Sequence, residues 1–216
     1  MSRSLDAVYV ATCDDEIAKV VEDFGGEAIM TGSCHERCTD RIAEAIEGRD
    51  ADIIVNIQGD EPMVRPEMIE QAVAPMLEDR TLDCVNLMAV IGDPRDFHDP
   101  NEVKVVCDTR GYALYFSREP IPSEKKYGKP VTGYKQVCII PFRREFLFTY
   151  TRLPPTPLEI IESVDMLRVL EHGYKIRMVL TDCETCSVDT RGDLEHVEQV
   201  MKNDPLVRAY AGERGR

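Results

Sequence analysis

The stretch Val55-Asn56-Ile57-Gln58-Gly59-Asp60-Glu61-Pro62 carries the strongest structural signal in this 216-residue chain. The apolar residues 52–57 predict a buried strand, and the polar residues 58–62 predict a turn at its C-terminal end. Ligands of open α/β sheets sit beyond the C-terminal ends of the strands, where this turn falls. A carboxylate there, such as that of Asp60, is a natural ligand for Mg²⁺, which prefers oxygen donors and usually brings a substrate phosphate. The simpler alternative is a polar turn that only ends a strand.

On both sides of this stretch, strand-like and helix-like segments alternate, which predicts an α/β fold. The strand-like segments are residues 7–12, 27–30, 52–57, 84–90, 103–107, 112–116, 135–140 and 175–180. The helix-like segments are residues 14–24, 39–47, 66–77, 143–150, 158–171 and 191–202. Residues 108–111 are typical of a hairpin turn, and prolines and glycines make residues 117–134 an irregular excursion. We expect one domain over residues 1–216, a three-layer α/β fold with a mostly parallel sheet and a small antiparallel insert near residues 92–150.

The charge balance excludes some partners. The formal net charge is −14, from 40 acidic and 26 basic residues, and no run of Lys and Arg exceeds two residues. A nucleic-acid-binding protein needs a basic face, so we expect no nucleic-acid partner. A phosphate-bearing substrate then requires local basic groups or a metal ion. No apolar run is long enough to span a bilayer and no secretory stretch follows Met1, which predicts a cytoplasmic protein without a membrane partner.

Two further segments carry candidate binding groups. Asp189 precedes a predicted helix. It is either the cap of that helix, a role that Thr190 is able to share, or, beside Asp60, a second metal ligand from a remote part of the chain. Arg118 leaves a strand in a proline-rich segment, where a guanidinium is able to grip a carboxylate or phosphate with two hydrogen bonds. The alternative for Arg118 is a surface arginine that pairs with Glu119 or Glu124.

The predicted helix over residues 158–171 carries a row of acidic side chains. Glu159, Glu162 and Asp165 recur every three residues, which predicts that they share one face of that helix. Such a face is usually solvated. In a sugar-binding site, the same carboxylates would accept hydrogen bonds from hydroxyl groups.

The chain contains eight cysteines. Cys34 and Cys38, with His35 between them, and the pair Cys183 and Cys186 admit a structural zinc site, which needs four ligands from such close pairs. The alternative is an incidental group of free thiols, because a domain of this size folds without a staple. Three further cysteines lie in apolar strand-like runs and are expected to be buried free thiols. These are Cys84, Cys107 and Cys138.

The chain resembles the 3-deoxy-manno-octulosonate cytidylyltransferase family over nearly all of residues 6–201. The matching runs include Val10-Ala11-Thr12, Met30-Thr31, Thr39-Asp40-Arg41, residues 55–62, Val103-Lys104-Val105-Val106, residues 111–118, Pro157-Leu158-Glu159 and Val188-Asp189-Thr190. The resemblance implies transfer of CMP from CTP to the anomeric oxygen of an acidic sugar, with release of pyrophosphate. It also implies a homodimer that forms through the insert.

The resemblance also implies roles for individual residues. It places the catalytic Mg²⁺ on Asp60 and Asp189. It implies that six further residues contact substrate, with Gln136 in the place of a sugar-binding histidine. These residues are Thr39, Gln58, Arg118, Gln136, Glu162 and Asp165.

The chain also departs from the family pattern. It begins at what would be the second strand of the family, so we expect the glycine- and arginine-containing phosphate loop to lie upstream, to be truncated, or to have been given up. Arg37 and Cys38 stand where a Ser-Gly pair precedes Thr39, and Cys38 crowds the place where that glycine lets backbone approach the nucleotide. These departures favour either an altered sugar acid or a catalytically inactive remnant that dimerises or binds sugars. Use of a different nucleotide is a weaker alternative.

Overall fold

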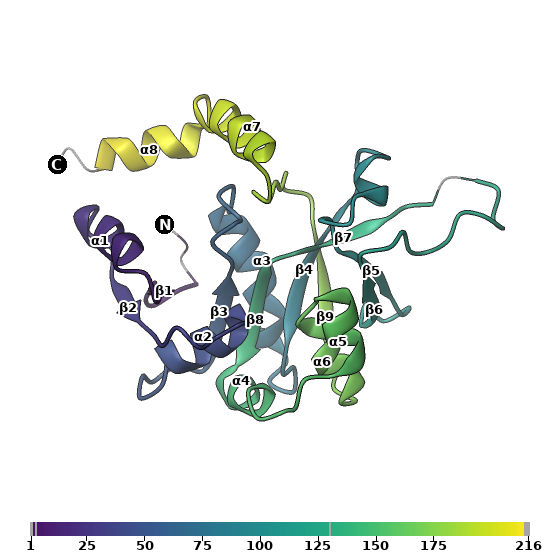
Figure 1. The fold of residues 1–216 in the computed structure, drawn as a ribbon, viewed down its shortest axis with the longest axis horizontal. Coiled ribbons are helices and arrows are strands. Elements are labelled where there is room, and N and C mark those ends of the chain that lie inside the picture. The colour runs from purple at the N-terminus through teal and green to yellow at the C-terminus, as the bar shows by residue number, and fades with distance from the viewer. Residues whose placement is uncertain (1, 3, 130, 214–216) are drawn as a thin grey trace.

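The computed structural model describes residues 2, 4–129 and 131–213 (Figure 1). The strands are β1 (Val10–Thr12), β2 (Ala28–Met30), β3 (Ile53–Ile57), β4 (Val85–Val90), β5 (Lys104–Cys107), β6 (Ala113–Ser117), β7 (Tyr134–Val137), β8 (Ile139–Arg143) and β9 (Arg177–Thr181). The α-helices are α1 (Asp15–Asp23), α2 (Cys38–Ala45), α3 (Pro66–Glu78), α4 (Arg144–Tyr150), α5 (Pro157–Glu162), α6 (Met166–Glu171), α7 (Arg191–Met201) and α8 (Pro205–Glu213). Strands and α-helices alternate from β1 to β4 and then occur in runs, β5 to β8 and α4 to α6. The α/β class is therefore confirmed, and α8 lies beyond the last helix that the sequence predicts.

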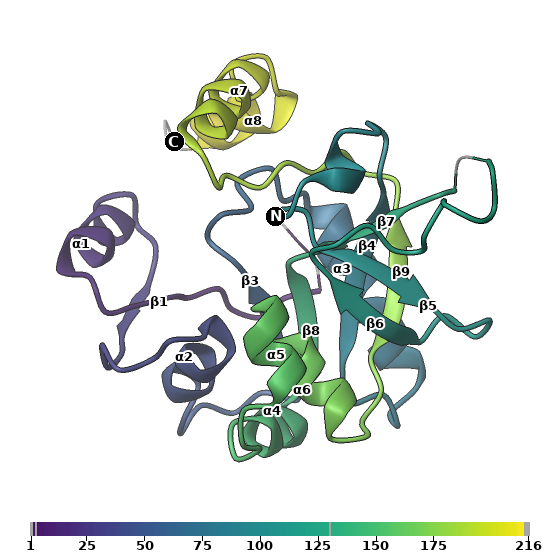
Figure 2. The ribbon, with the colours of Figure 1, turned by 45° about the vertical axis from the view of Figure 1, so that its right-hand side comes forward.

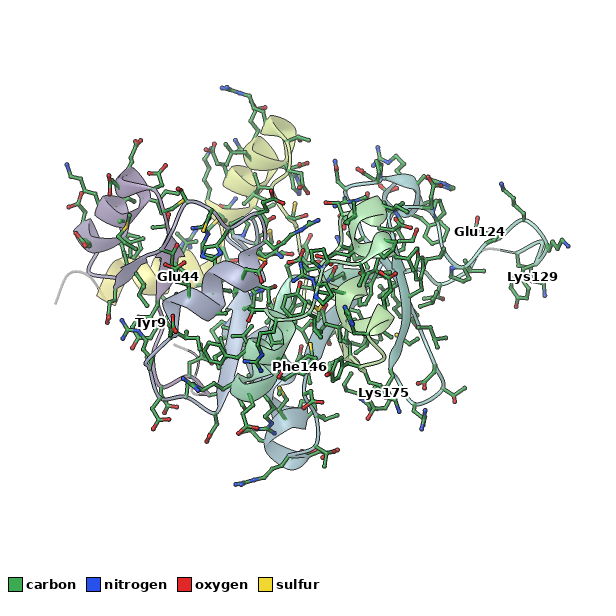
Figure 3. All side chains as sticks on the ribbon, turned by 60° about the horizontal axis from the view of Figure 1, so that its bottom comes forward. Tyr9, Glu44, Glu124, Lys129, Phe146 and Lys175 are labelled. Carbon is green, nitrogen blue, oxygen red and sulfur yellow. The ribbon has the colours of Figure 1, made fainter. Side chains whose placement is uncertain are left out.

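Local signals explain several of these boundaries. Asp14 caps α1, because its carboxylate accepts hydrogen bonds from the backbone N–H groups of Glu16 and Ile17 at 2.8 and 3.1 Å. Pro66 is the first residue of α3, where a missing N–H costs nothing. The predicted excursion is also present: Glu124 and Lys129 lie on a loop that projects away from the body of the protein (Figure 3).

The centre of the sheet differs from a simple parallel arrangement. β7 and β8 follow each other with only Cys138 between them; β7 pairs antiparallel with β4, and β8 pairs antiparallel with β3. β3 and β4 therefore run in the same direction with this ribbon between them, and β9 is parallel to β4. β7 and β8, the last strands of the predicted insert, therefore lie in the middle of the sheet. The apolar character of β8 suits this position, where it is buried on both faces.

Helices cover both faces of these central strands, which confirms the layered arrangement (Figure 2). Alternate residues of β8 point to opposite faces. Ile139 packs into a core with Met68 and Ala72 of α3. Ile140 and its neighbours on the same face pack into a second core with α4 and α6. Among the helices that the structure describes, none combines the length and apolar character that a membrane crossing requires.

The single helix predicted over residues 158–171 is wrong. Ser163 adopts a left-handed conformation, with φ of 53°, and this ends α5 before α6 begins. Because the backbone turns at Ser163, the side chains of Glu159, Glu162 and Asp165 point to three different environments and do not share a helical face. Their i,i+3 spacing indicates a common face only where the helix is continuous.

A buried ion pair holds the two short helices together. Arg168 of α6 donates two hydrogen bonds to the carboxylate of Glu159 of α5, at 2.8 and 2.5 Å. Their side chains are 5% and 1% exposed. The guanidinium of Arg168 also lies 4.6 Å from the ring centre of Tyr150 and 3.8 Å from a carboxylate oxygen of Asp40 in α2. One arginine therefore ties α2, α4, α5 and α6 to each other.

We predict that Glu159→Gln lowers the free energy of unfolding by about 3 to 5 kcal/mol, because buried Arg168 loses the carboxylate that accepts its two short hydrogen bonds and keeps only the 3.8 Å contact with Asp40. Urea unfolding followed by circular dichroism measures this change. The matched control is Glu195→Gln, which removes an exposed i,i+4 pair with Arg191 and should cost less than about 0.5 kcal/mol. Equal losses in the two variants would contradict the prediction.

Candidate functional site

A cavity of about 330 Å³ lies where the C-terminal end of β3 meets the loops before α2, β5, α6 and α7. The turn after β3 contributes three polar residues to its wall, as the position of this turn in the sequence predicts. These are Gln58, Asp60 and Glu61. From more distant segments come Arg37, Cys38, Asn101, Glu102, Arg118, Gln136, Ser163, Asp165 and Asp189. Segments from seven parts of the chain thus converge on one cavity.

The turn after β3 is attached to the central ribbon at Cys138. The backbone N–H of Gln58 donates to the carbonyl oxygen of Cys138 at 3.2 Å, and the N–H of Cys138 donates to the carboxylate of Glu61 at 3.3 Å. Cys138 belongs to neither β7 nor β8, so both of its backbone groups are available to the turn. These contacts fix where the carboxylates of the turn point.

Asp60 and Asp189 lie beside each other in this cavity. The N–H of Val188 donates to the carbonyl oxygen of Asp60 at 2.8 Å, which joins the two loops. Burial raises the pKa of Asp60, and the neighbouring charge of Asp189 raises it further. One carboxylate oxygen of Asp60 is buried without a hydrogen-bond partner among the described residues.

Asp189 does not cap α7, so that alternative is wrong. Thr190 is the cap: its hydroxyl accepts from the N–H of Asp193 at 3.3 Å, and the carboxylate of Asp193 accepts from the N–H of Thr190 at 2.7 Å. The carboxylate of Asp189 is exposed and accepts a hydrogen bond from Ser187 at 3.3 Å.

The pair of carboxylates fits a Mg²⁺ ion. Oxygen donors are what Mg²⁺ prefers, and the unpartnered oxygen of Asp60 is a donor without another role. Among the described residues no group of three His, Cys, Asp or Glu side chains is placed to hold a metal. Mg²⁺ is usually bound by one or two protein carboxylates, with water and substrate phosphate oxygens completing its shell.

Glu61 is a cavity residue that the sequence reasoning did not single out. Burial, the largest cause, raises the pKa of its carboxyl from 4.5 to about 7, and the charge of Asp60 contributes. Its only sequence signal is its position beside Asp60 in a turn at a strand end.

Four of the six predicted substrate contacts line the cavity: Gln58, Arg118, Gln136 and Asp165. The side-chain amide of Gln58 donates to the sulfur of Cys38 at 3.2 Å, and that of Gln136 donates to Asn86 at 2.6 Å. Their polar groups therefore form part of the cavity wall.

Thr39 and Glu162 are not among the described residues that line the cavity, so their predicted contact with substrate stays a prediction. Thr39 is fully buried, and its hydroxyl donates to Asp165 at 3.3 Å, so it positions that carboxylate. The carboxylate of Glu162 accepts from the N–H of Arg118 at 2.8 Å and from the hydroxyl of Ser117 at 2.9 Å. Hydrogen bonds inside the protein thus occupy both side chains.

Arg118 lines the cavity, but its guanidinium is engaged with backbone. It donates to the carbonyl oxygens of Pro100 and Glu162 at 2.7 Å each, and to that of Ser163 at 3.2 Å. This differs from both predicted roles, the anion grip and the surface ion pair. Arg118 joins the loop before β5 to the end of α5.

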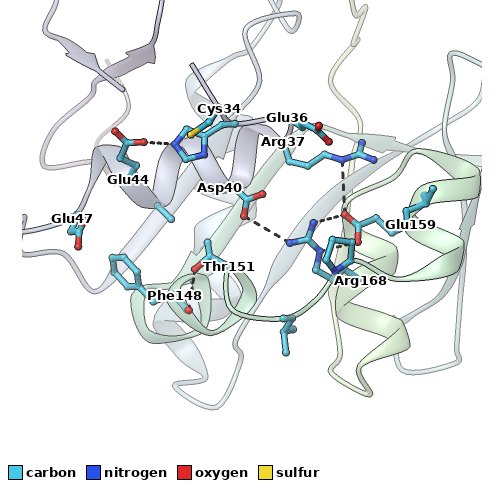
Figure 4. Close-up of a pocket in the computed structure, with 15 residues that line it drawn as sticks. Cys34, Glu36, Arg37, Asp40, Glu44, Glu47, Phe148, Thr151, Glu159 and Arg168 are labelled. Atoms are coloured by element: carbon cyan, nitrogen blue, oxygen red, sulfur yellow. Dashed lines mark hydrogen bonds and ion pairs between the residues drawn. The ribbon is translucent and has the colours of Figure 1, made fainter. Parts of the chain in front are cut away.

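The two cysteine pairs, Cys34 with Cys38 and Cys183 with Cys186, do not come together as a four-ligand zinc site among the described residues. Cys34 lines a second cavity, of about 920 Å³, whereas Cys38 lines the first (Figure 4). His35 between them contacts Glu44. All eight cysteines are free, and of those predicted to be buried only Cys84 is fully so; Cys107 and Cys138 are half-buried.

The chain is similar to known cytidylyltransferases. A family model described as cytidylyltransferase matches residues 1–176. The 3-deoxy-manno-octulosonate cytidylyltransferase of Geotalea uraniireducens (strain Rf4) is 46% identical over 205 residues, covering 90% of this chain and 82% of the relative. That of Chlorobium phaeobacteroides (strain DSM 266) is 44% identical over 208 residues, covering 95% of this chain and 84% of the relative.

Solved protein structures also superpose on this chain. A structure of CMP:2-keto-3-deoxy-manno-octonic acid synthetase complexed with CTP superposes with a TM-score of 0.86 at 39% identity, over 94% of this chain and 83% of that one. A putative glucose-1-phosphate thymidylyltransferase from Bacillus anthracis has a TM-score of 0.57 at 12% identity, over 88% and 72% of the two chains. The second likeness shows a shared fold alone.

The raised pKa of Glu61 predicts how stability depends on pH. Between pH 4.5 and 7 the folded protein keeps a proton on this carboxyl that the unfolded chain has lost, so stability rises as pH falls through this window. As pH rises from 5 to 7, we expect the free energy of unfolding of wild type to fall by on the order of 1 kcal/mol per pH unit relative to that of Glu61→Gln. Urea unfolding in metal-free buffer measures the difference, with the exposed Glu184→Gln as control. Parallel pH profiles for wild type and Glu61→Gln would overturn this prediction.

Proposed function

Because the chain belongs to the 3-deoxy-manno-octulosonate cytidylyltransferase family of nucleotidyltransferases, we propose that it transfers CMP from CTP to the anomeric oxygen of an acidic sugar. In this reaction the sugar hydroxyl loses its proton, its oxygen bonds to the α-phosphorus of CTP, and the bond to pyrophosphate breaks. The names of the relatives support 3-deoxy-manno-octulosonate as the sugar, and the CTP-bound structure supports the nucleotide.

The observation that carries this proposal is the meeting of Asp60 and Asp189 at one cavity, from loops 129 positions apart in the chain. Mg²⁺ held by these two carboxylates would neutralise the triphosphate and polarise the α-phosphate. The hydrogen bond from Val188 to Asp60 supports this role, because it keeps the two loops together before any ligand arrives.

The remaining cavity residues suit the recognition of a polyhydroxylated acid. The side-chain amides of Gln58 and Gln136 offer both donors and acceptors to sugar hydroxyls, and the carboxylate of Asp165 offers acceptors. Thr39 and Cys38 contact Asp165, so its carboxylate is oriented before the sugar binds. Positioning of this kind supplies much of the rate enhancement in phosphoryl and nucleotidyl transfer.

We predict that Asp60→Asn and Asp189→Asn each lower kcat for pyrophosphate release by about 100-fold or more, because each removes a charge that stabilises the transferring group. The assay couples pyrophosphate release to CTP and 3-deoxy-manno-octulosonate, with and without Mg²⁺. Asp182→Asn, an exposed residue near the same loop, is the matched control and should keep wild-type activity. Full activity of either site variant, or in chelator, would contradict the assignment.

The proposal includes a homodimer formed through residues 92–150. Its support is β6, one of the two edge strands of the five-stranded sheet among the described residues and the one that lies within this insert; Leu114 on β6 is 61% exposed. An edge strand with an exposed apolar side chain is suited to pairing with another chain.

We predict that Leu114→Glu shifts the protein from dimer to monomer in sedimentation velocity, because it places a charge on this apolar edge. Leu77→Glu is the control: it changes an exposed leucine in helix α3, outside the insert and away from any strand edge, and should leave the sedimentation coefficient unchanged. A wild-type protein that sediments as a monomer over the micromolar range would rule out the proposed dimer.

A further inference from the structure

The cavity is rich in carboxylates and poor in cations. Six acidic side chains line it: Glu36, Asp60, Glu61, Glu102, Asp165 and Asp189. Among the described residues, the basic side chains in its wall are Arg37 and Arg118. A sugar acid that enters this cavity therefore meets like charges, and its carboxylate needs a cation that is free to bind it.

Most of the nearby cations already have partners. The guanidinium of Arg118 donates hydrogen bonds to three backbone carbonyl groups. Lys104 is fully buried and donates to the carbonyl oxygens of Asp99 and Glu102 at 2.7 Å each. Lys135 pairs with the carboxylate of Glu102 at 2.8 Å. None of these three groups is placed to bind an incoming carboxylate without breaking an internal hydrogen bond or ion pair.

Arg37 is placed differently. It is the last residue before α2, and Figure 4 shows its side chain reaching toward Glu159 on α5. Its Nη1 donates to the hydroxyl of Ser163 at 3.2 Å and lies 3.4 Å from a carboxylate oxygen of Asp165. Its Nε lies 3.9 Å from Glu159, which is beyond hydrogen-bonding distance. Glu159 is already satisfied by Arg168 through two short hydrogen bonds.

The guanidinium of Arg37 is therefore able to donate further hydrogen bonds to a bound molecule. It has five N–H donors, and Nη1 makes the hydrogen-bonding contacts found among the described residues. The side chain is 26% exposed and lines both the 330 Å³ and the 920 Å³ cavities, so it stands at the junction between them. A planar guanidinium fork matches the geometry of a carboxylate.

We propose that Arg37 is a specificity-determining residue that binds the carboxylate of the acidic sugar at the junction of the two cavities. This inference rests on the proposed function. The hydroxyl of Ser163, which already meets Arg37, is a second donor for the same carboxylate. Recognition of the acid is thereby separated from the Asp60 and Asp189 pair, where additional negative charge is unfavourable.

The test compares Arg37→Ser and Arg37→Lys with wild type in steady-state transfer assays. Loss of a charged hydrogen bond to substrate is expected to raise KM for the sugar acid by about 10- to 100-fold in Arg37→Ser. Values of kcat and of KM for CTP should stay within about twofold, because the contact is equal in the ground and transition states. Arg37→Lys should be intermediate, since it keeps the charge but not the fork.

A second substrate separates recognition from a structural role. Wild type should prefer the sugar acid strongly over the same sugar with its carboxylate converted to a carboxamide, and Arg37→Ser should lose most of that preference. A merely structural role would weaken both substrates alike and leave their ratio unchanged. Arg110→Ser is the matched control, because Arg110 also pairs with an aspartate but lies outside both cavities. An unchanged preference in Arg37→Ser overturns the proposal.

Different results would contradict the proposed function and the role of Arg37. If wild type releases no pyrophosphate with any sugar acid, the proposed function fails. Isothermal titration of 3-deoxy-manno-octulosonate then tests Arg37 by itself: weaker binding to Arg37→Ser than to wild type and Arg110→Ser supports the proposal. Equal dissociation constants, or no binding to wild type, overturn it.

Discussion

Two backbone groups of Cys138 determine where the cavity forms. At this residue the central ribbon changes its pairing partner from β4 to β3, so its N–H and carbonyl oxygen lie between the two regular ladders. The turn after β3 forms hydrogen bonds with both groups. The N–H of Gln58 donates to the carbonyl oxygen of Cys138, and the carboxylate of Glu61 accepts from its N–H. Buried backbone groups must be paired, so the turn that carries Asp60 is anchored to the middle of the sheet. A site supported by strands is held more rigidly than one supported by loops alone.

The electrostatics of the cavity follow from that anchoring. Burial is the main cause of the raised pKa values of Asp60, Glu61 and Asp165, and neighbouring carboxylates add to it. A cluster of this kind suits a divalent cation, and it opposes an anionic sugar for the same reason. In the proposed function the divalent cation and the sugar carboxylate therefore bind at separate places, the cation beside Asp60 and the carboxylate beside Arg37.

The break between α5 and α6 supplies the opposite wall of the cavity. The buried pair of Glu159 and Arg168 holds the two helices against each other, and the left-handed Ser163 lets the backbone turn between them. Glu162 then faces β6, while Asp165 reaches the cavity from the start of α6. Arg118 fastens this junction by donating to the carbonyl oxygens of Glu162 and Ser163. A continuous helix would have carried these carboxylates on one solvated face.

The sequence by itself determined the features that depend on near neighbours. The strand and turn over residues 52–62, a helix cap at Asp14 or Asp15 and the start of α3 at Pro66 follow from local periodicity, side-chain hydrogen bonding and the fixed geometry of proline, and the structure has the cap at Asp14. The residue pattern left Asp189 as either a helix cap or a second metal ligand beside Asp60, and the resemblance to a family favoured the metal ligand. Only the tertiary structure decided that Thr39 is buried, that backbone carbonyls occupy Arg118 and that an antiparallel ribbon lies between β3 and β4. The physical reason is that the partners in these contacts come from distant parts of the chain, and local sequence does not specify which distant group will satisfy a buried donor.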